Sequence, residues 1–250
     1  MERDSYASGS PCWVDLASPD IEASIAFYSS LLGWEVAEPH PDAGGYRIAH
    51  LRGKSVAGVG PQQGPVPAWT TYFATVDAEA HAAAITAHGG TVMMGPMDVM
   101  DQGRMVIATD PEGAVFGLWQ AQSFPGAQLY AETGAFGWNE LWTRDREKAK
   151  AFYPKVFGSE ADDEAMPGYT IWKIDGQMAG GAMTIPADMP PQVPAHWAVY
   201  FNVDDTDTSA ARVTELGGSV VAPPFNVEGV GRIALVHGPA HESFGLFSAL

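Results

Sequence analysis

Apolar residues at helical spacing follow the first strand-like stretch of the chain. Asp20 precedes them, and aspartate accepts hydrogen bonds from the free N–H groups at a helix start. Gly33 follows them, and glycine readily adopts the left-handed conformation found just past a helix end. The pattern therefore predicts a helix between Asp20 and Gly33 with one buried stripe. That stripe consists of Ile21, Ile25, Tyr28 and Leu32.

The same strand-to-helix pattern occurs four times. In each case a strand-like run ends at an aspartate, and a glycine follows 13 residues later (33−20). The pairs are Asp20 and Gly33, Asp77 and Gly90, Asp145 and Gly158, and Asp204 and Gly217. Pro154 falls inside the third predicted helix. Because proline costs a helix interior about 3 kcal/mol, we expect that helix to be bent or shortened.

Short strand-like runs separated by turns follow each predicted helix. In the first half they are 46–51, 55–59, 91–94, 105–109 and 114–120. One helix followed by several strands, four times over, predicts an α+β fold with mixed sheets and helices on one face.

The two halves of the chain repeat each other. Phe27-Tyr28 returns as Phe152-Tyr153 at an offset of 125 (152−27). Near the end of each half, Phe116-Gly117-Leu118 returns at an offset of 128 (244−116). This period is far longer than the roughly 20–50 residues of a solenoid repeat. We therefore expect two duplicated domains, 8–122 and 134–250, joined by a linker at 123–133.

Charge and composition narrow the classes of partner. The net charge of −17 and the pI near 4.5 argue against binding to the nucleic acid backbone or to an anionic membrane surface. No stretch approaches the roughly 18 apolar residues of a membrane span, and the first ten residues lack the apolar run of a signal peptide. The lone Cys12 is expected to be buried beside a strand. We expect a cytoplasmic protein, monomer or homodimer, whose partner is a small molecule.

Several motifs together resemble the vicinal oxygen chelate superfamily, which includes glyoxalase I, extradiol dioxygenases and bleomycin-binding proteins. They are the four strand–helix units, the Phe-Tyr-x-x-x-x-Gly helix end and the closing turn Asp110-Pro-Glu-Gly113. The stretches 11–16, 117–120 and 138–141 look like an actinobacterial tandem subfamily. Its members are often labelled hydroxylases, and some belong to aromatic polyketide pathways. The resemblance implies two tandem glyoxalase-like domains, each a pair of βαβββ units with mixed sheets curled around a cleft and helices outside.

Strand alternation assigns side chains to the implied clefts. Trp13 and Asp15 are expected to point into the first cleft, and Trp138, Glu140 and Trp142 into the second.

Metal-dependent relatives place His, Gln or Glu at four points in each cleft. Carried over by spacing, these points are Trp13, Gly58, Thr71 and Gly117 in the first copy, and Trp138, Gly180, Ala198 and Gly245 in the second. None of them offers the imidazole, thiolate or carboxylate that a transition metal requires. His40, His81, His88 and His196 fall in predicted loops or helices, while His50, His237 and His241 have no repeated partner. We therefore expect neither a metal nor a cofactor, and we expect Gly117 and Gly245 to leave open space.

Aromatic side chains take the place of metal ligands in the predicted clefts. The expected substrate-binding residues are Trp13, Phe73, Trp119, Trp138, Trp142, Tyr200, Asn202 and Phe247. Ring faces suit flat apolar ligands, although the same rings could simply pack the sheets together.

Two carboxylates remain in the predicted clefts, Asp15 and Glu140. A carboxyl group in an apolar cleft acquires a raised pKa, which suits a general acid or base near neutral pH. The alternative is a structural pair with the repeated arginines, Arg104 and Arg232.

Three functions remain open from the sequence. The first is a metal-independent protein or auxiliary enzyme that acts on a planar, largely apolar, aromatic polyketide-like ligand, with Asp15 or Glu140 as the catalytic group. The second is a binding or sequestering protein without turnover. The third is a metal-dependent glyoxalase or dioxygenase.

Overall fold

The computed structural model describes residues 1–39 and 41–249, so His40 lies outside the described part. In spatial order the first sheet contains β2 (Glu35–Val36), β3 (Arg47–Leu51), β4 (Lys54–Pro61), β1 (Pro11–Ser18), β5 (Ala68–Ala74), β8 (Val115–Ala121), β7 (Gly103–Thr109) and β6 (Thr91–Val99). The second contains β10 (Glu160–Asp162), β11 (Tyr169–Ile174), β12 (Gln177–Thr184), β9 (Phe136–Thr143), β13 (His196–Asn202), β16 (Ser243–Ser248), β15 (Gly231–His237) and β14 (Ser219–Val227). The identical order and mixed strand directions confirm two tandem α+β domains. The strands predicted in the first half correspond to β3, β4, β6, β7 and β8, with β6 running on to Val99.

An aspartate caps the N-terminus of each of the four helices in the described part of the chain. The helices are α1 (Ile21–Leu32), α2 (Ala78–Ala87), α3 (Arg146–Phe157) and α4 (Thr206–Glu215). The predicted caps Asp20, Asp77 and Asp145 each accept a backbone N–H, but the fourth cap is Asp205 and not Asp204. Asp205 is the cap because its carboxylate accepts a hydrogen bond from the backbone N–H of Thr208, three residues later in the first turn of the helix.

Helix ends match the prediction at three positions of four. Gly33 and Gly158 are left-handed C-caps, and Gly217 is left-handed just past α4. The exception is α2, whose C-cap is His88 and is followed by a left-handed Gly89, not Gly90. The predicted shortening at Pro154 is wrong, since α3 keeps the 12 residues of α1. Pro154 instead lies in the last turn, where the carbonyl group of Pro154 still accepts from Gly158.

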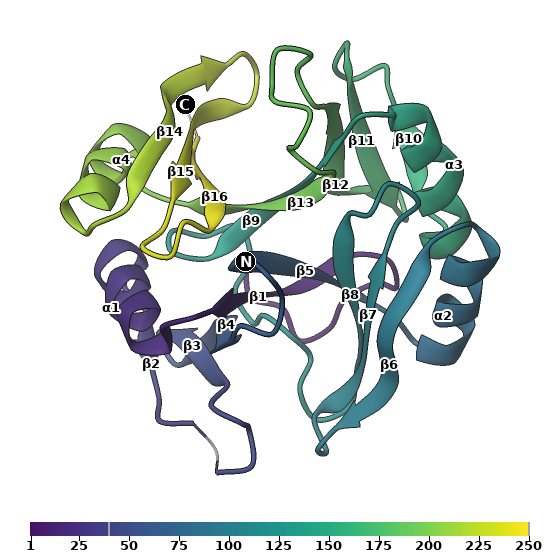
Figure 1. Cartoon of the computed structure of the whole chain (residues 1–250), viewed down its shortest axis with the longest axis horizontal. Helices are drawn as coiled ribbons and strands as arrows, with labels where there is room; N and C mark the ends of the chain where they lie inside the picture. The colour runs from purple at the N-terminus through teal and green to yellow at the C-terminus, as the bar shows by residue number, and fades with distance from the viewer. Residues whose placement is uncertain (40, 250) are drawn as a thin grey trace.

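The two sheets lie back to back, and each curves away from the other (Figure 1). Strands β5 and β13 make the contact between them, with α1 beside α4 at one side and α2 beside α3 at the other. Cys12 is fully buried in β1, as predicted. Among the described residues no helix is long and apolar enough to cross a bilayer.

A buried hydrogen-bond chain joins the helix of one domain to the closing turn of the other. The Tyr28 hydroxyl donates to Glu242 Oε1 at 2.8 Å, and the indole N–H of Trp69 donates to the same hydroxyl at 3.0 Å. Tyr28 and Glu242 are both 0% exposed. The tyrosine of the Phe-Tyr motif therefore ties the first domain to the second.

The repeat makes this connection reciprocal. The Tyr153 hydroxyl donates to Asp110 Oδ2 at 3.0 Å and accepts from the indole N–H of Trp197 at 3.0 Å. Asp110 opens the closing turn of the first domain, where its other oxygen accepts from the N–H groups of Glu112 and Ala114. Two equivalent tyrosine–carboxylate pairs thus fix the domains to each other.

Candidate functional site

The curved outer face of the first sheet carries a carboxylate held by two tyrosines. In the strand register Trp13 lies opposite Tyr72, and Asp15 lies opposite Gly58 on the next strand. Asp15 Oδ2 accepts from the hydroxyls of Tyr46 at 3.2 Å and Tyr72 at 3.0 Å. The Trp13 indole donates to the Tyr46 hydroxyl at 2.8 Å. We call these four side chains the first carboxylate cluster.

Asp15 remains partly accessible within this cluster. Its side chain is half-buried, and both phenols donate to Oδ2. Burial among the rings raises the pKa of Asp15 to about 7, although the hydrogen bonds from Tyr72 and Tyr46 oppose the shift. The carboxyl group of Asp15 is therefore poised to change charge near neutral pH.

The raised pKa predicts that Asp15 makes the fold less stable as pH increases. A carboxyl whose folded-state pKa exceeds its ordinary value of 3.8 binds its proton more tightly when folded. Its contribution to stability is complete below about pH 4 and is lost as pH rises through about 7. We expect the stability of Asp15→Asn relative to wild type to be greater at about pH 8 than at about pH 5, measured as the difference in urea midpoints at each pH.

The matched control is Asp4→Asn, which removes the same charge from an exposed residue. It corrects for the general repulsion in a chain of net charge −17. A difference between Asp15→Asn and wild type that is equal at both pH values would contradict the raised pKa.

The second sheet repeats the cluster around Glu140. Glu140 Oε1 accepts from the Tyr169 hydroxyl, and Oε2 accepts from the Tyr200 hydroxyl, both at 2.8 Å. The Trp142 indole donates to Oε2 at 2.7 Å, and the Trp138 indole donates to the Tyr169 hydroxyl at 2.9 Å. Burial raises the pKa of Glu140, which is 8% exposed, and the three donated hydrogen bonds oppose that rise. We call this set the second carboxylate cluster.

Sequence reasoning identified the carboxylates and missed three of the seven other side chains in the two clusters. Tyr46, Tyr72 and Tyr169 were not predicted as site residues. Trp13, Trp138, Trp142 and Tyr200, which were predicted to bind substrate, belong to the clusters. A repeated Gly-Tyr dipeptide, 45–46 and 168–169 at an offset of 123 (169−46), was the available signal. The loops between the helices and the Gly-Tyr dipeptides differ in length in the two halves. The dipeptides therefore recur at an offset of 123 and not at the 125 of the helices, which makes their repetition hard to see.

Two predicted roles are wrong. Phe73 points toward the other domain, with its ring 4.8 Å from Phe157 and 5.1 Å from Trp197. Its neighbour Tyr72 takes the outer face because successive strand residues alternate. The arginines do not pair with the cluster carboxylates: Arg104 pairs with Glu79 and Asp98, and Arg232 pairs with Asp207.

Two of the carried-over metal positions face the wrong side. Thr71 accepts a hydrogen bond from Asn139 of the other domain, and a Cβ on Gly180 would approach the Asn139 carbonyl oxygen. The residues on the outer face are Thr70, opposite Asp15, and Gly181, opposite Glu140.

Tyrosines fill the space that metal ligands would need. A Cβ on Gly58 or Gly181 would overlap the hydroxyl of Tyr46 or Tyr169. The space expected at Gly117 and Gly245 is likewise taken, by the rings of Tyr72 and Tyr200. Among the described residues no three His, Cys, Asp or Glu side chains gather in a metal-binding group. The residues at the family's metal positions therefore do not fit a divalent metal ion.

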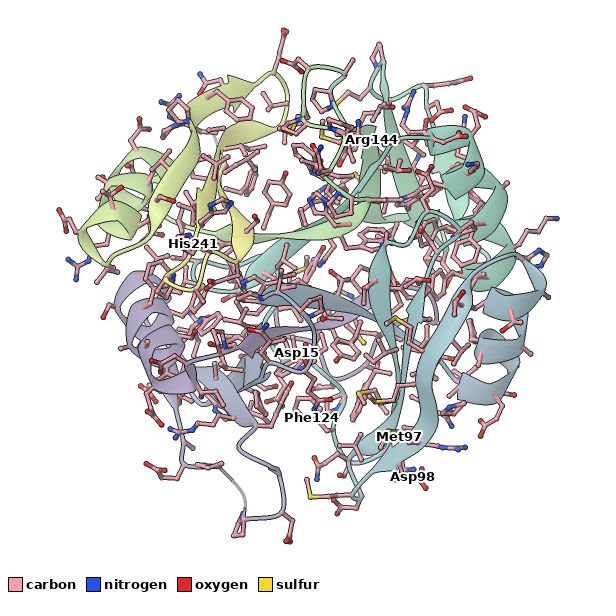
Figure 2. All side chains as sticks on the ribbon, in the orientation of Figure 1. Asp15, Met97, Asp98, Phe124, Arg144 and His241 are labelled. Atoms are coloured by element: carbon pink, nitrogen blue, oxygen red, sulfur yellow. The ribbon has the colours of Figure 1, made fainter. Side chains whose placement is uncertain are left out.

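Phe124 packs on the outer face of the first domain. Its ring meets that of Trp13 edge-on at 4.9 Å, and its carbonyl accepts from the Trp119 indole at 2.8 Å. Figure 2 shows Asp15 and Phe124 on the side of the first sheet that faces away from the second domain, with Arg144 at the opposite side of the molecule. The two outer faces therefore open in opposite directions.

The second domain has a cavity of about 190 Å³ beside its cluster. It is lined by Trp142, Met189, Val193, His196, Ala198, Val221, Leu235, Val236, His237, Ser243 and Phe244. Ala198 lies directly opposite Glu140 in the sheet, so the cluster borders the cavity. His196, predicted in a loop or helix, begins β13 instead.

A loop between β12 and β13 closes one side of this cavity. Met189 and Val193 from the loop line the cavity. The Arg144 guanidinium donates to the carbonyl groups of Pro190 at 2.8 Å and Val193 at 3.2 Å. One arginine thus holds the loop over the cavity.

The remaining predicted binding residues lie outside the cavity lining. Phe247 packs against Gly231, as Trp119 packs against Gly103 in the first domain. Asn202 covers Gly137 at the end of β13. Trp138 is connected to the second carboxylate cluster by its hydrogen bond to Tyr169.

Comparison with known proteins agrees with the repeat and the fold. The profile of the Glyoxalase/Bleomycin resistance protein/Dioxygenase superfamily matches residues 12–118 and again 135–244. The protein CFP32 of Mycobacterium bovis is 41% identical over 255 residues, covering 98% of this chain and 97% of its own length. The anthracycline biosynthesis protein DnrV of Streptomyces peucetius is 39% identical over 238 residues, covering 88% and 86%.

A solved structure confirms the same architecture at lower identity. The Mn(II)-bound glyoxalase from Novosphingobium aromaticivorans superimposes with a TM-score of 0.69 at 16% identity, covering 98% of this chain and 83% of that one. The duplicated match, the two relatives and the shared fold lead to one conclusion. The chain belongs to the glyoxalase/bleomycin resistance protein/dioxygenase superfamily.

Proposed function

We propose that the cavity of the second domain binds a planar, largely apolar aromatic molecule of the polyketide type, and that the protein acts on it without a metal ion. The observation that carries this proposal is the cavity itself, which lies beside the second carboxylate cluster and has Trp142 in its lining. Its other lining side chains are mostly aliphatic, which suits an apolar ring.

The size of the cavity sets the part of the ligand that enters. At about 190 Å³ it exceeds the roughly 150 Å³ of an apolar pocket that holds one benzene ring. A fused two-ring portion therefore fits inside. Val221 lines the cavity while remaining 51% exposed, so it marks a rim along which further rings can extend. The relatives named for anthracycline biosynthesis support such a fused-ring ligand.

Glu140 is the proposed acid–base group. It lies opposite Ala198 in the sheet and accepts from the Trp142 indole, and both of these residues line the cavity. Burial raises the pKa of Glu140, so a larger fraction of the carboxyl group is protonated near neutral pH than in water. Proton transfer by this group is therefore feasible without a metal ion. Asp15 is the corresponding group of the first domain, where Phe124 packs on the outer face.

A second candidate function is binding or sequestering without turnover. The observation that favours it is the hydrogen bonding of Glu140, which accepts from three donors, so a purely structural role satisfies it. Measured proton transfer to a bound ligand separates the two functions.

Trp142→Ala should weaken binding of a flat aromatic probe by roughly 1–3 kcal/mol, because apolar burial and ring contact are lost. The probe is 2-naphthol, whose two fused rings match the cavity. Quenching of tryptophan fluorescence and calorimetry both report the dissociation constant.

The control for this change is Trp119→Phe, on the outer face of the first domain. It should leave the affinity for 2-naphthol unchanged. If Trp119→Phe weakens binding and Trp142→Ala does not, the ligand site is in the first domain.

A further inference from the structure

His196 occupies a fixed position in the wall of the second-domain cavity. It is the first residue of β13 and lies opposite Trp142 in the sheet. Its ring stacks on that of Trp142, with 5.8 Å between centroids and 26° between planes. Since the Trp142 indole is itself held by Glu140, the imidazole rests on an anchored surface.

One hydrogen bond sets which nitrogen of His196 carries the proton. Nδ1 lies 2.9 Å from the carbonyl oxygen of Pro194, and a carbonyl oxygen can only accept. Nδ1 is therefore the N–H donor, and in the neutral ring Nε2 is the acceptor. Burial lowers the pKa of His196, which favours the neutral ring at pH 7, although the Pro194 carbonyl opposes that shift.

The wall around His196 offers little other polar chemistry. Ser243 and His237 are the only other side chains with polar hydrogen-bonding groups, apart from the engaged indole of Trp142, among the described residues that line the cavity. An acceptor in a largely apolar wall favours a ligand that brings a donor to it, because a ligand without one leaves the acceptor unpaired.

We propose that Nε2 of His196 accepts a hydrogen bond from a hydroxyl group on an aromatic ring, so that the cavity selects phenolic ligands over their methylated or unsubstituted analogues. This inference rests on the proposed function, because it assigns the polar contact of the same cavity. His196 is thereby a specificity-determining residue, and the flat rings contact Trp142 and the aliphatic wall.

The first test compares three probes on the wild-type chain: 2-naphthol, 2-methoxynaphthalene and naphthalene. NMR chemical-shift titration gives each dissociation constant. We expect 2-naphthol to bind roughly three- to tenfold more tightly than 2-methoxynaphthalene, the range of one hydrogen bond. The ¹⁵N resonance of His196 Nε2 should shift with 2-naphthol and stay in place with 2-methoxynaphthalene. Equal affinities, or an unmoved Nε2 resonance, would overturn the assignment.

The second test compares His196→Phe with His237→Phe. Both changes remove an imidazole from the same cavity and keep an aromatic ring. Melting temperatures check that each variant is folded. His196→Phe should abolish the preference for 2-naphthol while naphthalene still binds, and His237→Phe should retain the preference. Loss of the preference in His237→Phe alone would move the contact to His237. Failure of all three probes to bind the wild-type chain would reject the proposed function as well, whereas binding without preference rejects only the role of His196.

Discussion

Tyr28→Phe should lower the free energy of unfolding by about 3 kcal/mol, although it removes a single oxygen atom. That oxygen donates to Glu242 and accepts from Trp69 inside the domain interface. Without it, Glu242 Oε1 loses a donor and the Trp69 indole loses its acceptor, at a fully buried position that water does not reach. Urea unfolding followed by circular dichroism measures the loss.

A double-mutant cycle with Glu242→Ala, which removes the acceptor, isolates the contact between the two side chains. Because the tyrosine hydroxyl and the carboxylate are direct partners, the two single losses should not add. Tyr46→Phe is the matched control, since its hydroxyl bonds Asp15 on the outer face of one domain and joins no domains. Additive losses in the cycle would show that the Tyr28–Glu242 bond contributes nothing of its own.

Much of the fold follows from the sequence because its signals are local. Asp20 and Gly33 mark the ends of a helix by their own backbone chemistry, and the repeat extends that signal to the other units. Where two adjacent residues offer the same side chain, as Asp204 and Asp205 do, the local signal fails by one position. A one-residue error also assigned Thr71 and Gly180 to the clefts, whereas both lie on the inner face, since strand faces alternate.

The site was harder to predict because its partners come from separate parts of the chain. Asp15 receives hydroxyls from Tyr46 and Tyr72, which are 31 and 57 residues away in the chain. Nothing near Asp15 in the sequence signals these contacts, which depend on the register of three strands. The position of His196 in a cavity wall could not be predicted either, because the cavity also depends on a distant loop that Arg144 holds in place.

Glu140→Gln should separate binding from proton transfer in the second domain. The amide has nearly the shape of the carboxyl group and can still accept from Tyr200 and Trp142 through its oxygen, so 2-naphthol should bind within a few-fold of wild type. The hydroxyl of Tyr169 must rotate to accept from the new amide, at a cost of about 1–2 kcal/mol in stability. The amide cannot exchange a proton, so catalysis that depends on Glu140 should fall by about 10²–10⁴-fold.

Hydrogen exchange in D₂O measures this loss without knowledge of the natural reaction. In 1,3-dihydroxynaphthalene the ring hydrogen between the hydroxyls exchanges with solvent through a keto tautomer, which requires one proton delivered to carbon and one removed. The wild-type chain should accelerate this exchange, and Glu140→Gln should not.

Asp15→Asn is the control, because it makes the same kind of change in the first domain, where Phe124 packs on the outer face. Because burial raises the pKa of Glu140, the protonated form that delivers the proton is lost as pH rises through that raised value, and the exchange rate should fall with it. Bound probe with no accelerated exchange in wild type would favour the sequestering function, and an accelerated rate that survives Glu140→Gln would assign the proton transfer to another group.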